Sequence, residues 1–159
     1  FQNPDHQIIF PTVEEEIAFG LTQTGLSKVE AARQVTAILN RFDRSAWAKA
    51  PIHQLSQGQR QLVCLMSVLA MAPQVIVLDE PFAGLDIPTK RQLERALAAL
   101  DVTLVQITHE PQGLTGYDRV IWLEEGQIAA DGPPQEVIPA FVTRMEQLGE
   151  DDDLAHLSG

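Results

Sequence analysis

The chain has 159 residues, of which 45% are hydrophobic and 21% are charged, proportions typical of a globular protein with one substantial core. Its 22 acidic residues outnumber its 11 basic residues, which argues against a protein that binds nucleic acid through the phosphates. The single cysteine excludes an internal disulfide, and no cysteine cluster or histidine pair has the spacing of a zinc site. The longest apolar stretch, residues 62–73, is shorter than the about 20 residues that cross a bilayer.

Two capping boxes predict helices in the first third of the chain. Thr12 precedes Glu15 and Ser27 precedes Glu30 at the spacing at which hydroxyl and carboxylate satisfy each other's backbone amides, so helices should begin near residues 13 and 28. In the second of these helices the apolar residues recur at about 3.6-residue spacing. They predict one core-facing stripe: Val29, Ala32, Val35, Ile38, Leu39 and Phe42.

A third helix is predicted from about Ser56 to Ala70, ending before Pro73. Its inward residues should be Leu62, Leu65, Met66 and Leu69. It begins within Leu55-Ser56-Gln57-Gly58-Gln59, and backbone amides at a helix N-terminus attract phosphate oxygens. A small residue such as Gly58 suits a close approach of ligand to backbone, although a serine at this position is also an ordinary helix cap.

After residue 73 the apolar pattern changes from helical to extended. Residues 75–78 and 102–107 are short aliphatic and β-branched runs, typical of strands buried on both faces. A helix from about Pro88 to Leu100 separates them, and strand, helix and strand in succession predict a parallel pair. Residues 119–123 and 127–130 predict a hairpin, and residues 134–148 one or two closing helices.

Asp79 and Glu80 end the first predicted strand. A carboxylate there can hold Mg²⁺ or orient an attacking water, so we expect Asp79 to bind the metal or its water and Glu80 to polarise a lytic water against a γ-phosphate. His109 follows the second strand and should emerge at the carboxyl edge of the sheet, within reach of a γ-phosphate oxygen. A solvated acidic pair is the plain alternative for the two carboxylates.

Five motifs in order resemble the nucleotide-binding subunits of ABC-type transporters. They are the glutamine loop Phe1-Gln2-Asn3-Pro4, the signature Leu55 to Gln59, the Walker B strand Val75 to Glu80, the D-loop Ala83-Gly84-Leu85-Asp86 and the switch histidine in Thr108-His109-Glu110. The resemblance implies an α/β fold: part of a P-loop NTPase core with a mostly parallel sheet, plus an α-helical subdomain. It divides the chain into a glutamine loop (1–11), a helical subdomain with the signature (12–72), a part of the α/β core (73–133) and a C-terminal helix with an acidic tail (134–159).

The resemblance also implies an ATP site shared between two ATPase subunits, identical or different. Gln2 would bind Mg²⁺ and sense the γ-phosphate. Ser56, Gln57, Gly58 and Gln59 would contact the ATP held by the opposite subunit, with Gln57 standing where the family commonly has glycine. Asp86 would couple the two sites across the dimer, although an aspartate before Ile87-Pro88 would equally serve as an N-cap.

Within that family, residues 1–7 and 10–20 resemble the glutamine loop and following helix of energy-coupling-factor importers, and residues 117–123 favour the biotin type over its cobalt and nickel relatives. This implies a transmembrane coupling subunit, a separate membrane subunit that binds the substrate, no nucleic acid, and a peripheral place on the cytoplasmic face of the membrane. Ile8, Ile9 and Phe10 should line a groove for a partner helix; a strand or core filler is the alternative.

No phosphate-cradling loop of the form G-x-x-x-x-G-K-[ST] occurs among the 159 residues, and the chain begins with Phe1. We therefore expect a part of a longer ATPase, which by itself binds nucleotide poorly. Three alternatives remain: a noncatalytic binding module, a translation factor built of paired cassettes, and a chromosome or DNA-repair ATPase. The acidic charge and the lack of sustained heptads in residues 12–54 disfavour the last of these.

Overall fold

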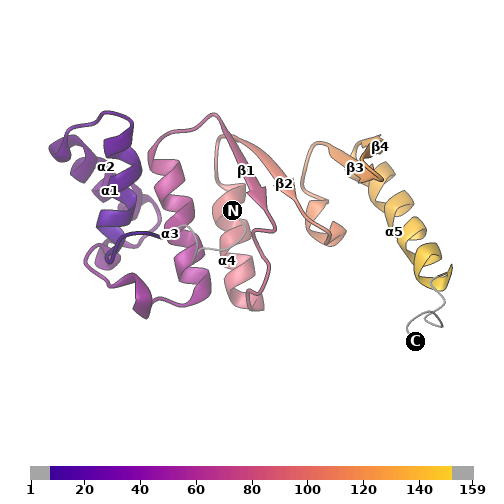
Figure 1. The fold of residues 1–159 in the computed structure, drawn as a ribbon, viewed down its shortest axis with the longest axis horizontal. Coiled ribbons are helices and arrows are strands. Elements are labelled where there is room, and N and C mark those ends of the chain that lie inside the picture. The colour runs from indigo at the N-terminus through magenta and orange to yellow at the C-terminus, as the bar shows by residue number, and fades with distance from the viewer. Residues whose placement is uncertain (1–7, 152–159) are drawn as a thin grey trace. The chain divides into compact units, whose positions relative to one another are not determined.

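The computed structural model describes residues 8–151, which fall into two compact units divided between Ile107 and Thr108 (Figure 1). The first unit contains helices α1 to α4 and strands β1 and β2, and the second contains strands β3 and β4 and helix α5. This mixture agrees with the expected α/β class. Gln2 lies outside the described residues. In the described part, no helix combines the length and apolar character that a membrane span requires.

The two capping boxes predicted for the first third of the chain both form. Helix α1 spans Val13–Gln23 and helix α2 spans Lys28–Arg41. The backbone amide of Thr12 donates to the carboxylate of Glu15 at 3.2 Å, and that of Ser27 donates to Glu30 at 3.0 Å. Each helix therefore begins where its capping residues satisfy amides that have no partner inside the helix.

The stripe predicted for α2 is correct at its centre and wrong at its start. Val35, Ile38 and Leu39 are buried and Phe42 is half-buried, but Val29 is 81% exposed and Ala32 is exposed. Ala31 is buried in their place. Successive residues of a helix are rotated by about 100°, so the face that contains positions 31, 35 and 38 turns position 29 toward solvent.

Helix α3, Gln57–Ala70, is the most deeply buried helix of the first unit. Leu62, Leu65, Met66 and Leu69 point inward as predicted, and Gln61, Val63 and Cys64 are buried as well. The reason is that α3 lies between α1 and α4, and it also contacts α2 (Figure 1). Short 3₁₀ turns at Ser45–Trp47 and Ile52–Gln54 connect α2 to α3.

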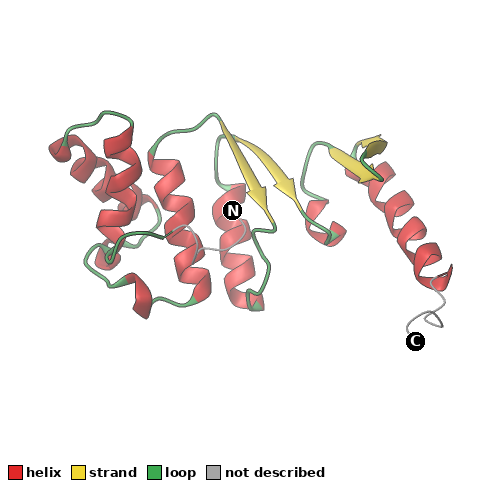
Figure 2. Ribbon diagram, viewed as in Figure 1, coloured by secondary structure: helices red, strands yellow, loops and turns green. Residues whose placement is uncertain are grey.

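Strands β1, Val75–Asp79, and β2, Thr103–Ile107, form the predicted parallel pair, joined by helix α4, Ile87–Ala98. Figure 2 shows the two strands side by side and pointing the same way. In their register Val75 pairs with Thr103 and Asp79 with Ile107. The carboxyl ends of both strands therefore meet at one edge of the sheet.

The prediction that both faces of this sheet are buried is wrong for the described chain. Ile76 and Leu78 are 2% and 3% exposed, whereas Val75 and Val77 are 54% and 53% exposed. Helices α3 and α4 supply the cover for the first face, and in the described part of the unit no helix covers the second. An aliphatic run indicates a strand that can be buried on both faces. Whether both faces are buried depends on the elements that pack on them.

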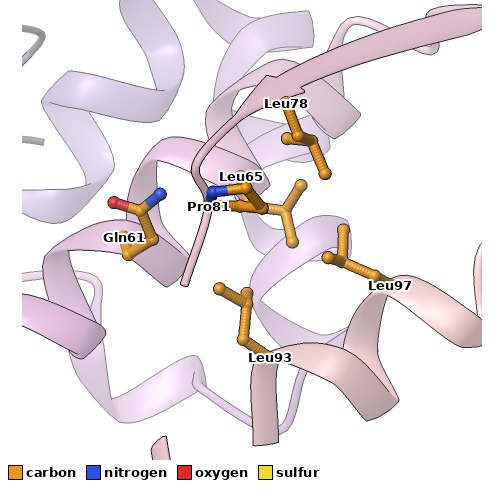
Figure 3. A pocket seen from close by; sticks show the side chains of 6 residues that line it. All are labelled: Gln61, Leu65, Leu78, Pro81, Leu93 and Leu97. Atoms are coloured by element: carbon orange, nitrogen blue, oxygen red, sulfur yellow. The ribbon is translucent and has the colours of Figure 1, made fainter. Parts of the chain in front are cut away.

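Figure 3 shows the seam between the covered face, α3 and α4. Its lining residues are Gln61, Leu65, Leu78, Pro81, Leu93 and Leu97, and the cavity between them is about 10 Å³. A space of that size accepts one water at most, and an apolar lining offers such a water few partners. The seam is part of the packed core and holds the end of β1 against both helices.

The second unit is a hairpin with one helix packed on it. Strands β3, Val120–Glu124, and β4, Gln127–Gly132, pair antiparallel, and helix α5 spans Pro134–Asp151 without a break at its internal proline. A short 3₁₀ turn at Pro111–Leu114 precedes the hairpin. Glu125 and Gly126 have φ values of 50° and 77°, the left-handed pair of a two-residue type I′ turn. Trp122 packs edge-on against Phe141 of α5, with ring centroids 5.6 Å apart.

Candidate functional site

The predicted site residues of the first unit occupy three places: the start of α3, the end of β1 and the turn before α4. At the start of α3 Ser56 is the N-cap. Its amide donates to Oε1 of Gln59 at 2.9 Å, and the Gln59 amide donates back to the Ser56 hydroxyl at 3.3 Å. Ser56, Gln57 and Gln59 are nevertheless exposed. The predicted cap thus exists and engages the amides of Ser56 and Gln59, while these residues remain at the surface.

Gly58 sits where α3 and α4 touch. A Cβ atom at this position would lie 1.9 Å from Cγ2 and 3.1 Å from Cβ of Thr89 in the first turn of α4. Such distances leave no room for a side chain. A hollow of about 120 Å³ opens beside this contact, between Ser56, Gly58, Thr89 and the Trp47 ring. The glycine is therefore required by packing within the chain, in addition to any approach of phosphate to its backbone.

Gln57 links the signature to the D-loop. Gly84 has φ of 72°, in the left-handed region that favours glycine, and a Cβ there would lie 3.1 Å from Nε2 of Gln57. The Gln57 carboxamide thus lies over the Gly84 backbone. A glycine at position 57, as the family commonly has, could not make this contact.

Asp86 is the N-cap of α4, as one of its two predicted roles requires. Its carboxylate accepts a hydrogen bond from the Thr89 amide at 2.9 Å. The pKa of Asp86 is held below its ordinary value, mainly by a hydrogen bond from the Thr89 side chain and, to a smaller extent, by the bond from the Thr89 amide. The carboxylate is exposed and charged, and it fixes the first turn of α4 against Gly58.

Glu80 follows β1 in a strained conformation that the sequence did not reveal. Its φ is 46°, which costs a non-glycine residue about 1–2 kcal/mol, and Pro81 further disfavours a helical conformation at the preceding residue. Its amide donates to the carbonyl of Ile107 at 2.9 Å, and its carbonyl accepts from the Ala83 amide at 3.1 Å. These bonds hold the turn. Asp43, Ala72 and Glu125 have similar φ values of 50–55°, so the backbone strain does not by itself distinguish Glu80, and its catalytic role stays a prediction.

Asp79 is half-buried at the last position of β1. Its carboxylate is the oxygen donor that Mg²⁺ prefers. Among the described residues no three histidine, cysteine, aspartate or glutamate side chains cluster in a way that could hold a metal. A single carboxylate in this position is compatible with one protein ligand beside phosphate oxygens and water, and the metal-binding role of Asp79 stays a prediction.

His109 follows the last residue of β2 by two positions, is exposed, and belongs to the second unit. Its approach to a γ-phosphate stays a prediction, as does the role of Gln2 in Mg²⁺ binding.

The predicted partner segment lies at the start of the first unit. Ile9 is 70% exposed, whereas Ile8 and Phe10 are half-buried. The alternative prediction, that these residues fill the core, therefore applies in part to Ile8 and Phe10. The Phe10 ring lies 5.0 Å from the Phe19 ring of α1. Next to it is a groove of about 680 Å³, here called the α1–α2 groove, whose lining includes Phe10, Phe19, Ala31, Ala32, Val35 and Lys49.

Sequence reasoning missed Glu16. Its side chain is only 8% exposed, and its Oε2 accepts hydrogen bonds from the amides of Ile9 and Phe10, each at 2.9 Å. The three consecutive glutamates that open α1 carry no signal that separates this one from its exposed and half-exposed neighbours.

Comparisons with known proteins agree with the motifs. Residues 1–83 match the protein family described as "ABC transporter". The Biotin transport ATP-binding protein BioM of Rhodobacter capsulatus is 53% identical over 148 residues, which cover 93% of this chain and 63% of that protein. The Energy-coupling factor transporter ATP-binding protein EcfA1 of Caldanaerobacter subterraneus subsp. tengcongensis is 36% identical over 164 residues, 98% of this chain and 59% of that protein.

Among solved structures, cbiO1 from Clostridium perfringens, described as part of the ABC transporter complex cbiONQ, superposes with a TM-score of 0.77 and 32% identity. The match covers 93% of this chain and 61% of that one. The chain therefore spans less than two thirds of the length of each of these relatives.

Proposed function

This chain belongs to the ABC transporter family, and from that premise we propose that it is part of an ATP-binding subunit that couples ATP hydrolysis to import through an energy-coupling-factor transporter. The observation that carries the proposal is the packing of two motifs, the signature and the D-loop, against each other within one unit. Gln57 of the signature covers Gly84 of the D-loop, and Gly58 touches Thr89 just beyond it. Residues that would face two ATP molecules in a dimer are thus in contact with each other within one unit.

In the proposed dimer each ATP is handled by residues of both subunits. The exposed residues Ser56, Gln57 and Gln59 and the positive end of the α3 dipole around Gly58 would face the triphosphate bound by the opposite subunit. The homo- or heterodimer would close around the nucleotide, and Asp86 at the adjoining cap would carry the change from one site to the other.

The carboxyl end of β1 supplies the catalytic carboxylates. When bound, Mg²⁺ neutralises charge on the phosphates, and Asp79 would hold it. Glu80 would accept a proton from the attacking water, with its backbone turn keeping the carboxylate in place. His109 would contact the γ-phosphate, and Gln2 would report its presence to the segment that follows.

The transported molecule is proposed to be biotin, with cobalt or nickel ions as the alternative substrates. The support is the 53% identity to a protein named for biotin transport, while the superposition on cbiO1 supports the wider class. The substrate itself would be bound by a separate membrane subunit. The subunit described by this chain would sit peripherally on the cytoplasmic face of the membrane.

The α1–α2 groove is the proposed seat for a helix of the transmembrane coupling subunit. Its lining combines apolar residues, among them Phe10, Phe19 and Val35, with charged ones such as Glu15 and Lys49, and Ile9, the sequence neighbour of Phe10, is 70% exposed. A groove with these features suits an amphipathic helix. The description of cbiO1 as part of an ABC transporter complex supports a partner that belongs to a transporter.

The proposed chemistry is tested with Glu80→Gln in the full-length protein that contains this chain. We expect ATP binding to persist and steady-state hydrolysis to fall by about 100-fold or more, because the amide cannot accept the proton of the attacking water. Glu125→Gln is the matched control, since Glu125 has a similar φ of 50° in the hairpin turn. Hydrolysis near the wild-type rate in Glu80→Gln would contradict the assignment.

The substrate is tested by uptake of labelled biotin and, separately, of Co²⁺ and Ni²⁺ into proteoliposomes that hold the full-length protein with its membrane partners. Uptake of biotin driven by ATP supports the proposal. Uptake of a metal ion alone would replace biotin with the alternative substrate, and hydrolysis with no uptake of any of them would leave an ATPase outside this importer class.

A further inference from the structure

Glu16 is a buried carboxylate that the proposed chemistry does not use. It lies in the first turns of α1, is 8% exposed, and accepts the amides of Ile9 and Phe10 through a single oxygen. Buried carboxylates are rare unless they are paired, because the charge loses its hydration. Here two charge-assisted hydrogen bonds and the positive end of the α1 dipole offset that loss.

These bonds fix one end of the 8–12 segment to α1. At its other end the Ile52 amide donates to the Pro11 carbonyl at 2.9 Å, and Thr12 forms a bridge with Pro51. Both ends of the segment are therefore held by hydrogen bonds to its own unit.

The contacts of the 8–12 segment lead to the signature. Ile52 begins the 3₁₀ turn Ile52–Gln54, and only Leu55 separates that turn from Ser56, the cap of α3. Two more backbone bonds, from Val13 to Ala50 and from Glu14 to Ala48, tie the start of α1 to the same stretch. A displacement of the 8–12 segment thus acts through backbone on the segment that positions Ser56.

The same segment shapes the proposed partner site. Phe10 lines the α1–α2 groove and also a second hollow of about 380 Å³ that it shares with Pro11, Ile52 and Arg60. Its ring rests on Phe19, so the place of its backbone sets the place of the groove wall. Glu16 fixes that backbone.

We propose that Glu16 is a positioning residue whose carboxylate holds the 8–12 segment as one body, so that occupancy of the α1–α2 groove and the position of the signature change together. The proposal rests on the proposed function, since it concerns the coupling of hydrolysis to transport. Glu16 acts through Ile9 and Phe10 and touches neither nucleotide nor transported substrate.

The test uses the full-length protein reconstituted with its membrane partners in proteoliposomes. Wild type, Glu16→Ala, Glu16→Gln and Glu30→Ala are compared for ATP hydrolysis, for substrate uptake per ATP and for amide exchange at residues 9 and 10. Glu30 is the matched control, because it also accepts a backbone amide, that of Ser27 at 3.0 Å, in the first turn of the neighbouring helix but is exposed.

In Glu16→Ala we expect faster exchange at Ile9 and Phe10 and a fall in uptake per ATP of about 5-fold or more, with hydrolysis largely retained. Glu16→Gln should keep the wild-type amide exchange at Ile9 and Phe10 and the wild-type uptake per ATP, because its amide oxygen can still accept both hydrogen bonds. Glu30→Ala should leave uptake per ATP unchanged. If Glu16→Ala does not fold, Glu16→Asp serves in its place, since it keeps the charge but shortens the reach, and it should lose coupling while Glu16→Gln keeps it.

Uptake per ATP at the wild-type value in Glu16→Ala or Glu16→Asp would overturn the positioning role, as would a failure of Glu16→Gln to restore it. If hydrolysis and uptake in Glu16→Ala fell together and in proportion to the folded fraction of the variant, Glu16 would have a structural role only. That result would also overturn the positioning role. Absence of hydrolysis in the wild-type assembly would instead contradict the proposed function, while the exchange data would still report whether Glu16 holds the segment.

Discussion

The starts of α2 and α3 share one capping geometry and differ in what lies across from them. In both, the serine hydroxyl accepts the amide three residues on at 3.3 Å, and the serine amide donates back to a side chain at 2.9–3.0 Å. The second position of α2 is Val29, which is 81% exposed, while that of α3 is Gly58, pressed against Thr89. A capping box determines where a helix begins. Whether that helix start belongs to a site depends on the elements that pack against it.

The largest effect expected from this difference follows from Gly58→Ala. The added methyl would overlap Thr89, so we expect a loss of about 1–3 kcal/mol in the free energy of unfolding, measured by denaturant titration. Val29→Ala, at the same position of α2, should change it by less than about 0.5 kcal/mol. Thr89→Ser removes the Cγ2 methyl and should recover part of the loss in the double variant; additive losses would contradict the contact.

Removal of the serine caps separates stability from activity. Ser27→Ala and Ser56→Ala should each lower the free energy of unfolding by about 1 kcal/mol, since each deletes a similar hydrogen bond. Only Ser56→Ala should reduce ATP hydrolysis by the full-length protein, because only that hydroxyl would also meet phosphate. Equal rates of ATP hydrolysis in the two variants would mean that Ser56 acts only as a helix cap.

A second matched pair is Glu80 and Glu125, whose φ values are 46° and 50°. Glycine relieves the left-handed strain but adds unfolded-state entropy, so Glu125→Gly should stabilise the protein by roughly 0.5–1 kcal/mol, and Glu80→Gly should gain the same backbone relief but also lose the interactions of the Glu80 side chain. Hydrolysis should be lost in the first and retained in the second. Destabilisation by Glu80→Gly, seen as a lower thermal midpoint, would mean that the carboxylate itself holds the fold.

The smallest effect is a difference in pH response between the two caps. Hydrogen bonds from Ser27 hold the pKa of Glu30 below its ordinary value, so the carboxylate stabilises the fold above the unfolded-state pKa, and this contribution is lost as pH falls through the folded-state pKa. The α3 cap, formed by Ser56 and Gln59, has no titrating group. In NMR titrations below about pH 5, the Ser27 amide should shift with a step that Glu30→Gln abolishes, and the Ser56 amide should show none.

Much of the fold was predictable because its signals are local. Capping boxes, proline positions and apolar spacing predicted the helices and the parallel strand pair, and the apolar runs at residues 119–123 and 127–130 predicted the hairpin. The errors are nonlocal. Val29 fits the helical period but faces solvent, and Val75 and Val77 fit a buried strand but lie on an uncovered face, because the period of a segment does not say which neighbours pack on it.

The candidate site divides in the same way. Residue types at the end of a predicted strand proposed Asp79 and Glu80, the family resemblance proposed Ser56 and Asp86, and all four roles stay predictions. Three features needed the tertiary structure: the strained backbone of Glu80, the contact of Gly58 with Thr89, and the hold of Glu16 on the 8–12 segment. Each depends on the surroundings in which the folded chain places the residue.

By itself, the sequence of this protein determined its helix starts, its strand order and its family, because each is written in residues close together along the chain or in motifs of fixed order. Only the tertiary structure decided which faces are covered, which glycine is required for packing and which of three adjacent glutamates is buried. Hydrogen bonds and packing distances between distant segments set those outcomes, and residue type alone does not specify which segments meet.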